Sequence, residues 1–254
     1  RSPALHVVAA GSALIYAGGV ALNDVVDAEK DRELHPERPI PSGAIGRRPA
    51  ALVGWILLVL GAATSFVSDG PGLVVGLSVA AAVLLYDFGR SSWVGPFAMA
   101  AARGGNLLRG AALVGPLASP AVDAATHHVF LIFALTVISL LEDAPLDQRE
   151  PRLKFLKLSL FFGYLGPMRV AVDMENEALG IGAGIICLAV YCFVTRPFGK
   201  PTPPGLVVFR AVFTLSLVDA AYVFGTGKLI PAMLVACVVP VSYWIRGLIA
   251  QRGS

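Results

Sequence analysis

The sequence predicts an all-α membrane protein, a polytopic transmembrane helical bundle with about nine spanning helices around a central cavity. The first observation is composition, because 56% of the 254 residues are hydrophobic and only 15% are charged, with a mean hydropathy of +0.73. A soluble domain of this length needs more charged surface. The second observation is that apolar runs close to the ~20 residues needed to cross a bilayer recur along the whole chain.

Nine segments are expected to span the membrane, in a single integral-membrane domain that covers residues 1–254. The 27 glycines and 18 prolines are compatible with this, because small residues allow membrane helices to approach closely. Pro and Gly interrupt the chain at most of the junctions between segments. The expected segments are 3–22, 49–68, 71–88, 95–117, 126–141, 153–172, 178–195, 204–224 and 229–249.

Lysine and arginine are concentrated on alternate loops, and this asymmetry predicts the orientation of the bundle. The opposite loops carry acidic residues and the pair His127 and His128, which we expect at the outer interface. The acidic motifs described below therefore face the cytoplasm, and we expect the lipid bilayer of a bacterial inner membrane around the helices. The basic side carries Lys30, Arg32, Arg38, Arg47, Arg48, Arg90, Arg149, Arg152, Lys154, Lys157, Arg196 and Lys200.

The first acidic motif is Asn23-x-x-x-Asp27-x-x-x-Asp31, which directly follows the first apolar run. Residues four apart lie on one face of a helix. Carboxylates at a membrane edge are costly unless they pair or bind metal. Magnesium prefers oxygen ligands and substrate phosphates, so the motif predicts a Mg²⁺ site, although solvated loop acids are the alternative interpretation.

The second acidic motif is Asp143-x-x-x-Asp147, four expected spans later. Pro145 interrupts it, so helical spacing is not assured there. The alternative to a metal site is a cluster of helix-capping acids in a turn. Glu142 would be a further ligand or a hydrogen-bond acceptor for one.

A third group of polar residues lies on the expected segments 71–88 and 95–117. Three of them have i, i+3, i+6 spacing and share one helical stripe. Arginine within an apolar span needs an anionic partner. The stripe therefore predicts either a clamp on diphosphate oxygens, which arginine binds with two parallel hydrogen bonds, or a structural ion pair with a motif acid. The group comprises Tyr86, Asp87, Arg90, Arg103, Asn106 and Arg109.

Together, the two acidic motifs and the stretch Arg38-Pro39-Ile40-Pro41-Ser42-Gly43 resemble the UbiA family of membrane prenyltransferases. Residues 13–43 look closest to its EboC-like bacterial branch. That family carries both motifs four helices apart, with a similar loop after the first. In the family the first motif follows the second helix, whereas only one expected helix, 3–22, precedes it here.

The resemblance implies transfer of a prenyl group from an isoprenyl diphosphate to a lipophilic, aromatic acceptor within the membrane. It implies Mg²⁺ held by Asn23, Asp27, Asp31, Asp143 and Asp147. Arg103 is a further candidate catalytic residue because of its position inside the apolar segment 95–117. The implied substrate-binding residues are Asn23, Arg38, Ser42, Tyr86, Arg90 and Asn106. A terpene cyclase of the same family and a non-catalytic isoprenoid-binding or carrier protein stay open as alternatives. No basic and aromatic pattern indicates nucleic-acid binding.

Overall fold

The structure, a computed structural model, describes residues 3–89, 93–113, 117, 119–141, 156–158, 160–173, 177–196 and 203–241. These residues form helices joined by turns and loops, and no strand occurs among them. The all-α prediction is therefore confirmed for this part of the chain. The chain forms two compact units, Arg1–Ala125 and Thr126–Ser254.

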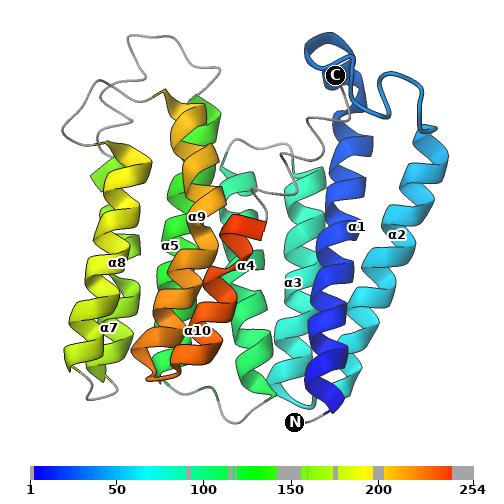
Figure 1. Cartoon of the computed structure of the whole chain (residues 1–254). Helices are drawn as coiled ribbons and strands as arrows, with labels where there is room; N and C mark the ends of the chain where they lie inside the picture. Colours follow the sequence, from blue (N-terminus) through cyan, green and yellow to red (C-terminus); the bar gives the residue numbers. More distant parts are fainter. Residues whose placement is uncertain are drawn as a thin grey trace. The chain divides into compact units, whose positions relative to one another are not determined.

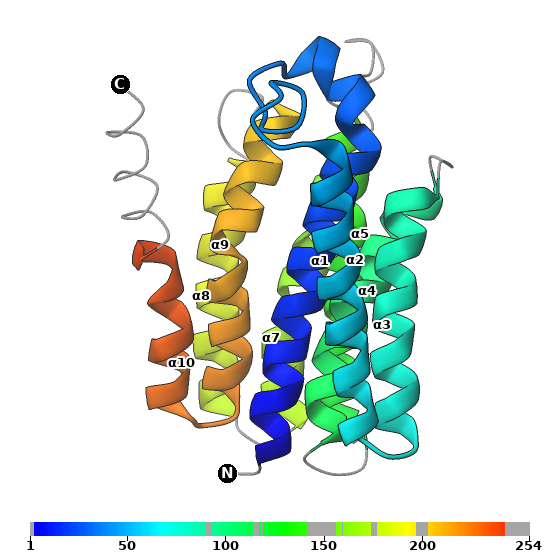
Figure 2. The same cartoon turned by 90° about the vertical axis from the view of Figure 1, so that its right-hand side faces the viewer.

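The first unit is built from four long helices (Figures 1 and 2). Helix α1 contacts α2, α3 and α4, and α3 packs along α4. The short 3₁₀ turn η1 continues α2 toward the start of α3. The bounds are Pro3–Leu34 for α1, Arg47–Ala63 for α2, Thr64–Val67 for η1, Pro71–Phe88 for α3 and Val94–Ala112 for α4.

Helix α1 extends beyond the spanning segment predicted at 3–22, to Leu34. Residues 23–34 contain alanine, glutamate, lysine, arginine and leucine, which favour a helix, and neither Gly nor Pro interrupts them. The first acidic motif therefore lies on the last turns of α1 instead of in a loop after it. This placement sets Asn23, Asp27 and Asp31 on consecutive turns.

Helices α1 and α2 approach each other closely through glycines. A Cβ added at Gly18 would lie 2.7 Å from the Leu58 backbone nitrogen and 2.8 Å from the Gly54 carbonyl oxygen. A Cβ at Gly61 would lie 2.7 Å from the Gly11 carbonyl oxygen. Such small residues let backbones meet, which is how membrane helices gain packing contacts without a hydrophobic driving force.

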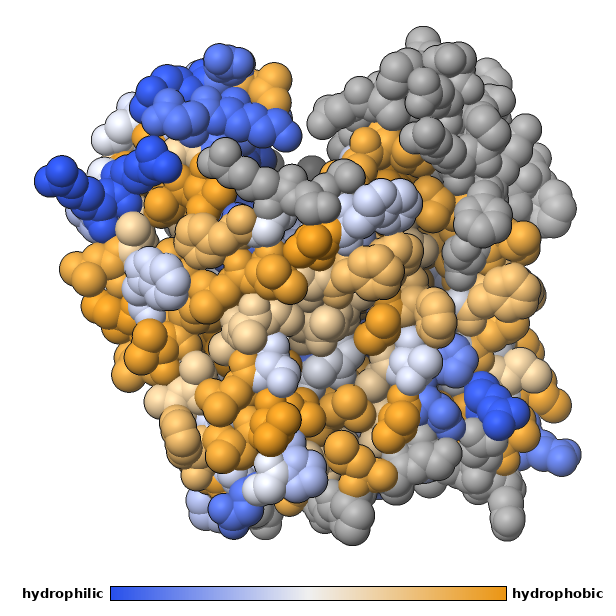
Figure 3. Space-filling view, turned by 180° about the vertical axis from the view of Figure 1, so that it is seen from behind, coloured by the Kyte–Doolittle hydropathy of each residue, from blue (hydrophilic) through white to orange (hydrophobic). Residues whose placement is uncertain are grey.

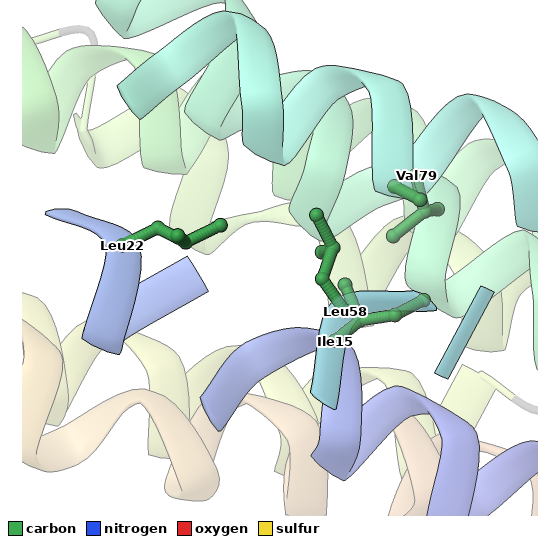
Figure 4. Packing of buried hydrophobic residues seen from close by; sticks show 5 residues of the cluster. Ile15, Leu22, Leu58 and Val79 are labelled. Carbon is green, nitrogen blue, oxygen red and sulfur yellow. The ribbon is translucent and has the colours of Figure 1, made fainter. Parts of the chain in front are cut away.

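Helices α1, α2 and α3 share a small apolar core at this contact. Ile15, Leu22, Leu58 and Val79 are buried and pack as one cluster with Ala80 (Figure 4). Outward-facing residues of α2 are large and apolar as well, including Leu52 and Val59. Figure 3 shows a largely hydrophobic flank, with hydrophilic residues gathered toward the ends, as expected for helices surrounded by lipid.

The second unit contains most of α5 and the helices α7 to α10. Helix α9 packs against α7, α8 and α10. His128 on α5 is buried and its Nε2 lies 2.9 Å from Oδ1 of Asp219 on α9. The imidazole of His128 is therefore buried against its neighbours and has a carboxylate partner, while its expected position at the outer interface stays a prediction. The bounds are Ser119–Leu140 for α5, Gly166–Asp173 for α7, Glu177–Thr195 for α8, Pro204–Gly225 for α9 and Leu229–Ala236 for α10.

Six helical stretches of the described chain are long and apolar enough to cross a membrane. They agree with predicted segments, but the count of about nine spans is not confirmed. Helix α4 is not among the six, and it carries Arg103, Asn106 and Arg109. The six stretches are Pro3–Leu34, Arg47–Val67, Pro71–Phe88, Pro120–Leu140, Glu177–Thr195 and Pro204–Gly225.

Candidate functional site

The first acidic motif begins with a hydrogen-bonded pair on α1. Asn23 donates from Nδ2 to Oδ2 of Asp27 at 3.1 Å, one turn further along the helix. Both side chains are half-buried. The amide therefore orients the carboxylate and leaves its other oxygen available to a ligand.

The motif's last carboxylate belongs to a different contact. Asp31 is only 5% exposed, and its Oδ2 accepts a hydrogen bond from Nη1 of Arg38 at 2.6 Å. Charge-assisted bonds of this length are among the stronger ones in proteins. Through this hydrogen bond, Arg38 holds the loop after α1 against the end of that helix.

The loop itself is held by its own backbone. The Ile45 amide donates to the Pro39 carbonyl at 2.9 Å, and Gly43 takes a φ of 81°, which favours glycine. The Ser42 hydroxyl donates to the Pro39 carbonyl at 3.3 Å. Ser42, expected to bind substrate, is exposed here and stabilises the turn.

A cavity of about 280 Å³ opens between α1, α3 and α4, all within the first unit. Four of the predicted site residues line it, namely Asn23, Tyr86, Arg103 and Asn106. Asp27 joins them through its bond to Asn23. The remaining lining residues are Ser12, Ile15, Tyr16, Gly19, Val20, Asp24, Val79, Val83, Asp87, Met99 and Ala102.

Arg103 lies beside Tyr16, about two turns of α1 before the first residue of the acidic motif. Its guanidinium stands 5.2 Å from the centre of the Tyr16 ring, an arrangement that favours a cation over an aromatic face. Asn23 is seven residues beyond Tyr16 on α1, about 10 Å at the usual helical rise. Arg103 and Asn106 share a face of α4, so they place a cation and an amide along the same wall.

Arg109, two turns further on α4, has a structural role. It is 0% exposed, and it donates to the Ser12 hydroxyl and the Gly61 carbonyl at 3.3 Å each. The Thr64 and Ser65 hydroxyls accept further hydrogen bonds from Nη2. Neutral oxygens accept the hydrogen bonds of Nη1 and Nη2, whereas Nε has no partner among the described residues. Asp27 and Asp31, the motif acids that the structure describes, make no ion pair with it.

Asp87 is a cavity residue that the sequence places in the third polar group but to which its pattern assigns no role. It is 8% exposed, it lines the cavity, and its Oδ2 has no hydrogen-bond partner among the described residues. The sequence feature that could have indicated a role is the position of Asp87 on an apolar segment, because carboxylates within a membrane usually have a function.

Four other predicted residues, Arg90, Glu142, Asp143 and Asp147, lie outside the described residues. The meeting of the two acidic motifs therefore stays a prediction. Within the described part of the chain, no three His, Cys, Asp or Glu side chains gather closely enough to hold a metal ion. Asn23 and Asp27 do supply adjacent oxygen donors of the type Mg²⁺ prefers. They fit a partial site that substrate oxygens, water and Asp143 or Asp147 would complete.

The chain is similar to several known enzymes. It is similar to the digeranylgeranylglyceryl phosphate synthase of Metallosphaera sedula, with 37% identity over 39% of this chain and 35% of the relative. It is similar to the synthase of the same name from Thermococcus gammatolerans, with 31% identity over 79% of each chain. The 4-hydroxybenzoate octaprenyltransferase of Acidovorax ebreus is 27% identical over 78% of this chain and 66% of the relative.

Coverage of these relatives is uneven. The chain spans about a third of the Metallosphaera protein and 28% of the Ignicoccus hospitalis synthase. No solved structure matches. The model of the UbiA prenyltransferase family matches residues 1–163, which include both acidic motifs and the whole cavity. The chain therefore belongs to the UbiA prenyltransferase family.

Proposed function

We propose that this protein transfers a prenyl group from an isoprenyl diphosphate to a lipophilic, aromatic acceptor inside the membrane, with Mg²⁺ as cofactor. The observation that carries the proposal is the Asn23–Asp27 pair beside a cavity that also contains Arg103. Family membership gives the reaction class. The EboC-like branch and the location in a bacterial inner membrane stay predictions.

The residues of α1 would hold the charged end of the donor substrate. Asn23, Asp27 and Asp31 would bind Mg²⁺ together with Asp143 and Asp147. Bound Mg²⁺ supplies positive charge that stabilises the diphosphate leaving group. Arg38 and Arg90 would add fixed positive charge near the motif.

The cavity would hold the parts of the substrates that react. Arg103 and Asn106 would bind phosphate oxygens that reach into it, and Tyr86 would contact the same substrate. The apolar lining, including Ile15, Val79 and Met99, excludes water from the carbon that loses its diphosphate. Catalysis then depends mainly on positioning and electrostatics.

The test is incubation of the purified full chain with Mg²⁺, a series of labelled prenyl diphosphates and a membrane lipid extract as acceptor source. We expect a labelled lipid product that requires the extract. A product formed from the diphosphate alone would indicate a cyclase instead. Tight binding of the diphosphate without its release would indicate a carrier.

The metal part of the proposal needs its own variant. Asp27→Ala should slow product formation by roughly three orders of magnitude, because several kcal/mol of charge stabilisation is lost. EDTA should have a comparable effect on the unchanged protein. Full activity under either condition would exclude the metal-dependent mechanism.

A further inference from the structure

Asp87 is a buried carboxylate that the proposed metal and diphosphate contacts do not use. It is the next-to-last residue of α3, and Oδ2 is fully enclosed without a partner among the residues that the structure describes. Three arginines of the described first unit have other partners. Arg38 binds Asp31, Arg103 stacks on Tyr16, and Arg109 binds hydroxyls and a carbonyl.

The carboxylate lies against the side of α1 that carries the acidic motif. A Cβ added at Gly19 would lie 4.0 Å from Asp87 Oδ2 and 2.6 Å from Val83 Cγ1, so only glycine leaves room for this approach. Gly19, Asn23 and Asp27 follow one another at four-residue intervals and share one face of α1. Asp87 is therefore about one helical turn, roughly 6 Å along α1, from the level of Asn23.

A carboxylate oxygen that is buried without a partner among the described residues is unfavourable, and in a membrane span it points to a ligand. When ionised it only accepts hydrogen bonds, so its ligand must donate one. A diphosphate offers negatively charged acceptor oxygens and would be repelled. A hydroxyl group on the second substrate has the required donor and a nucleophilic oxygen.

We propose that Asp87 binds the hydroxyl group of the acceptor and takes up its proton during transfer. This inference rests on the proposed prenyltransferase function. The acceptor oxygen forms a bond to C1 of the prenyl chain as the bond from C1 to the diphosphate oxygen breaks. The electron pair of that bond leaves with the diphosphate, and the hydroxyl proton passes to the Asp87 carboxylate.

The first experiment tests the hydroxyl group. The full chain is incubated with Mg²⁺, labelled geranylgeranyl diphosphate and a membrane lipid extract, either untreated or acetylated to block its hydroxyl groups. We expect a labelled product only from the untreated extract. An equal yield from the acetylated extract would overturn the inference while leaving the prenyltransferase proposal intact. No product from either extract would overturn the proposed function and this inference with it.

The second experiment replaces the carboxylate. Asp87→Asn keeps the shape but removes the proton acceptor, so turnover should fall at least ~100-fold, in the range of a lost general base. Affinity for geranylgeranyl diphosphate and for Mg²⁺, measured by titration, should stay within about twofold. Asp69→Asn, the same exchange at an exposed position before α3, is the matched control and should keep wild-type turnover.

Thermal unfolding separates this role from a structural one. Removing a buried charge whose Oδ2 has no partner among the described residues should leave the unfolding temperature of Asp87→Asn unchanged or raised while turnover is lost. Lost turnover with a lowered unfolding temperature would assign Asp87 to structure. A matching loss of Mg²⁺ affinity would assign it to the metal site. Wild-type turnover in Asp87→Asn would also overturn the inference.

Discussion

Arg38 and Asp31 form a short ion pair, with Nη1 and Oδ2 2.6 Å apart, across the end of α1. The carboxylate is buried whereas the side chain of the arginine is 43% exposed. Partial burial strengthens such a contact relative to a surface pair. The last acid of the motif is therefore already neutralised by the loop that follows it.

Replacing Arg38 should change the metal and diphosphate affinities in opposite directions. In Arg38→Gln the Asp31 carboxylate loses its cation, so half-maximal activity should need less Mg²⁺. The prenyl diphosphate should bind about tenfold more weakly, ~1.4 kcal/mol, because a positive charge near its phosphates is gone. Titrations of activity against each component measure both effects.

Arg47→Gln is the control for this prediction. Arg47 pairs with Glu29 at 3.4 Å, and both side chains are largely exposed. Such pairs contribute little, so both constants should stay within about twofold of wild type. A higher Mg²⁺ requirement in Arg38→Gln would contradict the expectation that Arg38 and Mg²⁺ compete for the Asp31 carboxylate.

Arg103 and Arg109 lie two turns apart on α4 and should respond differently to the same exchange. Lysine keeps the charge but loses the planar two-pronged donor. Arg103→Lys should weaken prenyl diphosphate binding about tenfold, ~1.4 kcal/mol, with normal protein yield. Binding assays and thermal unfolding of both variants give the comparison.

Arg109→Lys should instead lower stability. The guanidinium donates hydrogen bonds to the Ser12, Thr64 and Ser65 hydroxyls and to the Gly61 carbonyl. The single ammonium group of lysine cannot reach all four acceptors. Loss of buried charge-assisted bonds should cost about 2 kcal/mol of unfolding free energy. Unchanged diphosphate affinity with lowered stability in Arg103→Lys would instead remove Arg103 from the site.

The fold and part of the site were predictable from the sequence for identifiable reasons. Long apolar runs define membrane helices, so the segment 71–88 coincides with α3. The four-residue spacing correctly placed Asn23 and Asp27 on one face. Burial was harder to predict, because it depends on which helices meet. Spacing alone could not show that Arg109 is enclosed by Ser12 and Thr64, or that His128 pairs with Asp219.

The glycine contact between α1 and α2 predicts a strong effect of one methyl group. In Gly18→Ala the new Cβ would meet backbone atoms of Gly54 and Leu58, which cannot move without parting the helices. Overpacking of this kind costs about 1–3 kcal/mol, so the thermal unfolding temperature should fall. Gly110→Ala on α4 is the matched control, since a Cβ there meets nothing within 4 Å. Equal unfolding temperatures for the two variants would contradict the close approach.

The loops at the two ends of α2 should lie on opposite sides of the membrane. Arg47–Val67 is long and apolar enough to span it. The basic residues before this stretch predict that Ile45 faces the cytoplasm and that Asp69 lies outside. Mg²⁺ and a prenyl diphosphate would then meet Asp27 and Asp31 from the cytoplasmic side.

Single cysteines introduced at these positions measure the orientation. The three native cysteines are first replaced, since all are free thiols. An impermeant thiol reagent added to intact cells should label Asp69→Cys, whereas Ile45→Cys should react only after the cells are opened. Labelling of Ile45→Cys in intact cells would place the acidic motif outside. The orientation predicted from the basic loops would then be wrong.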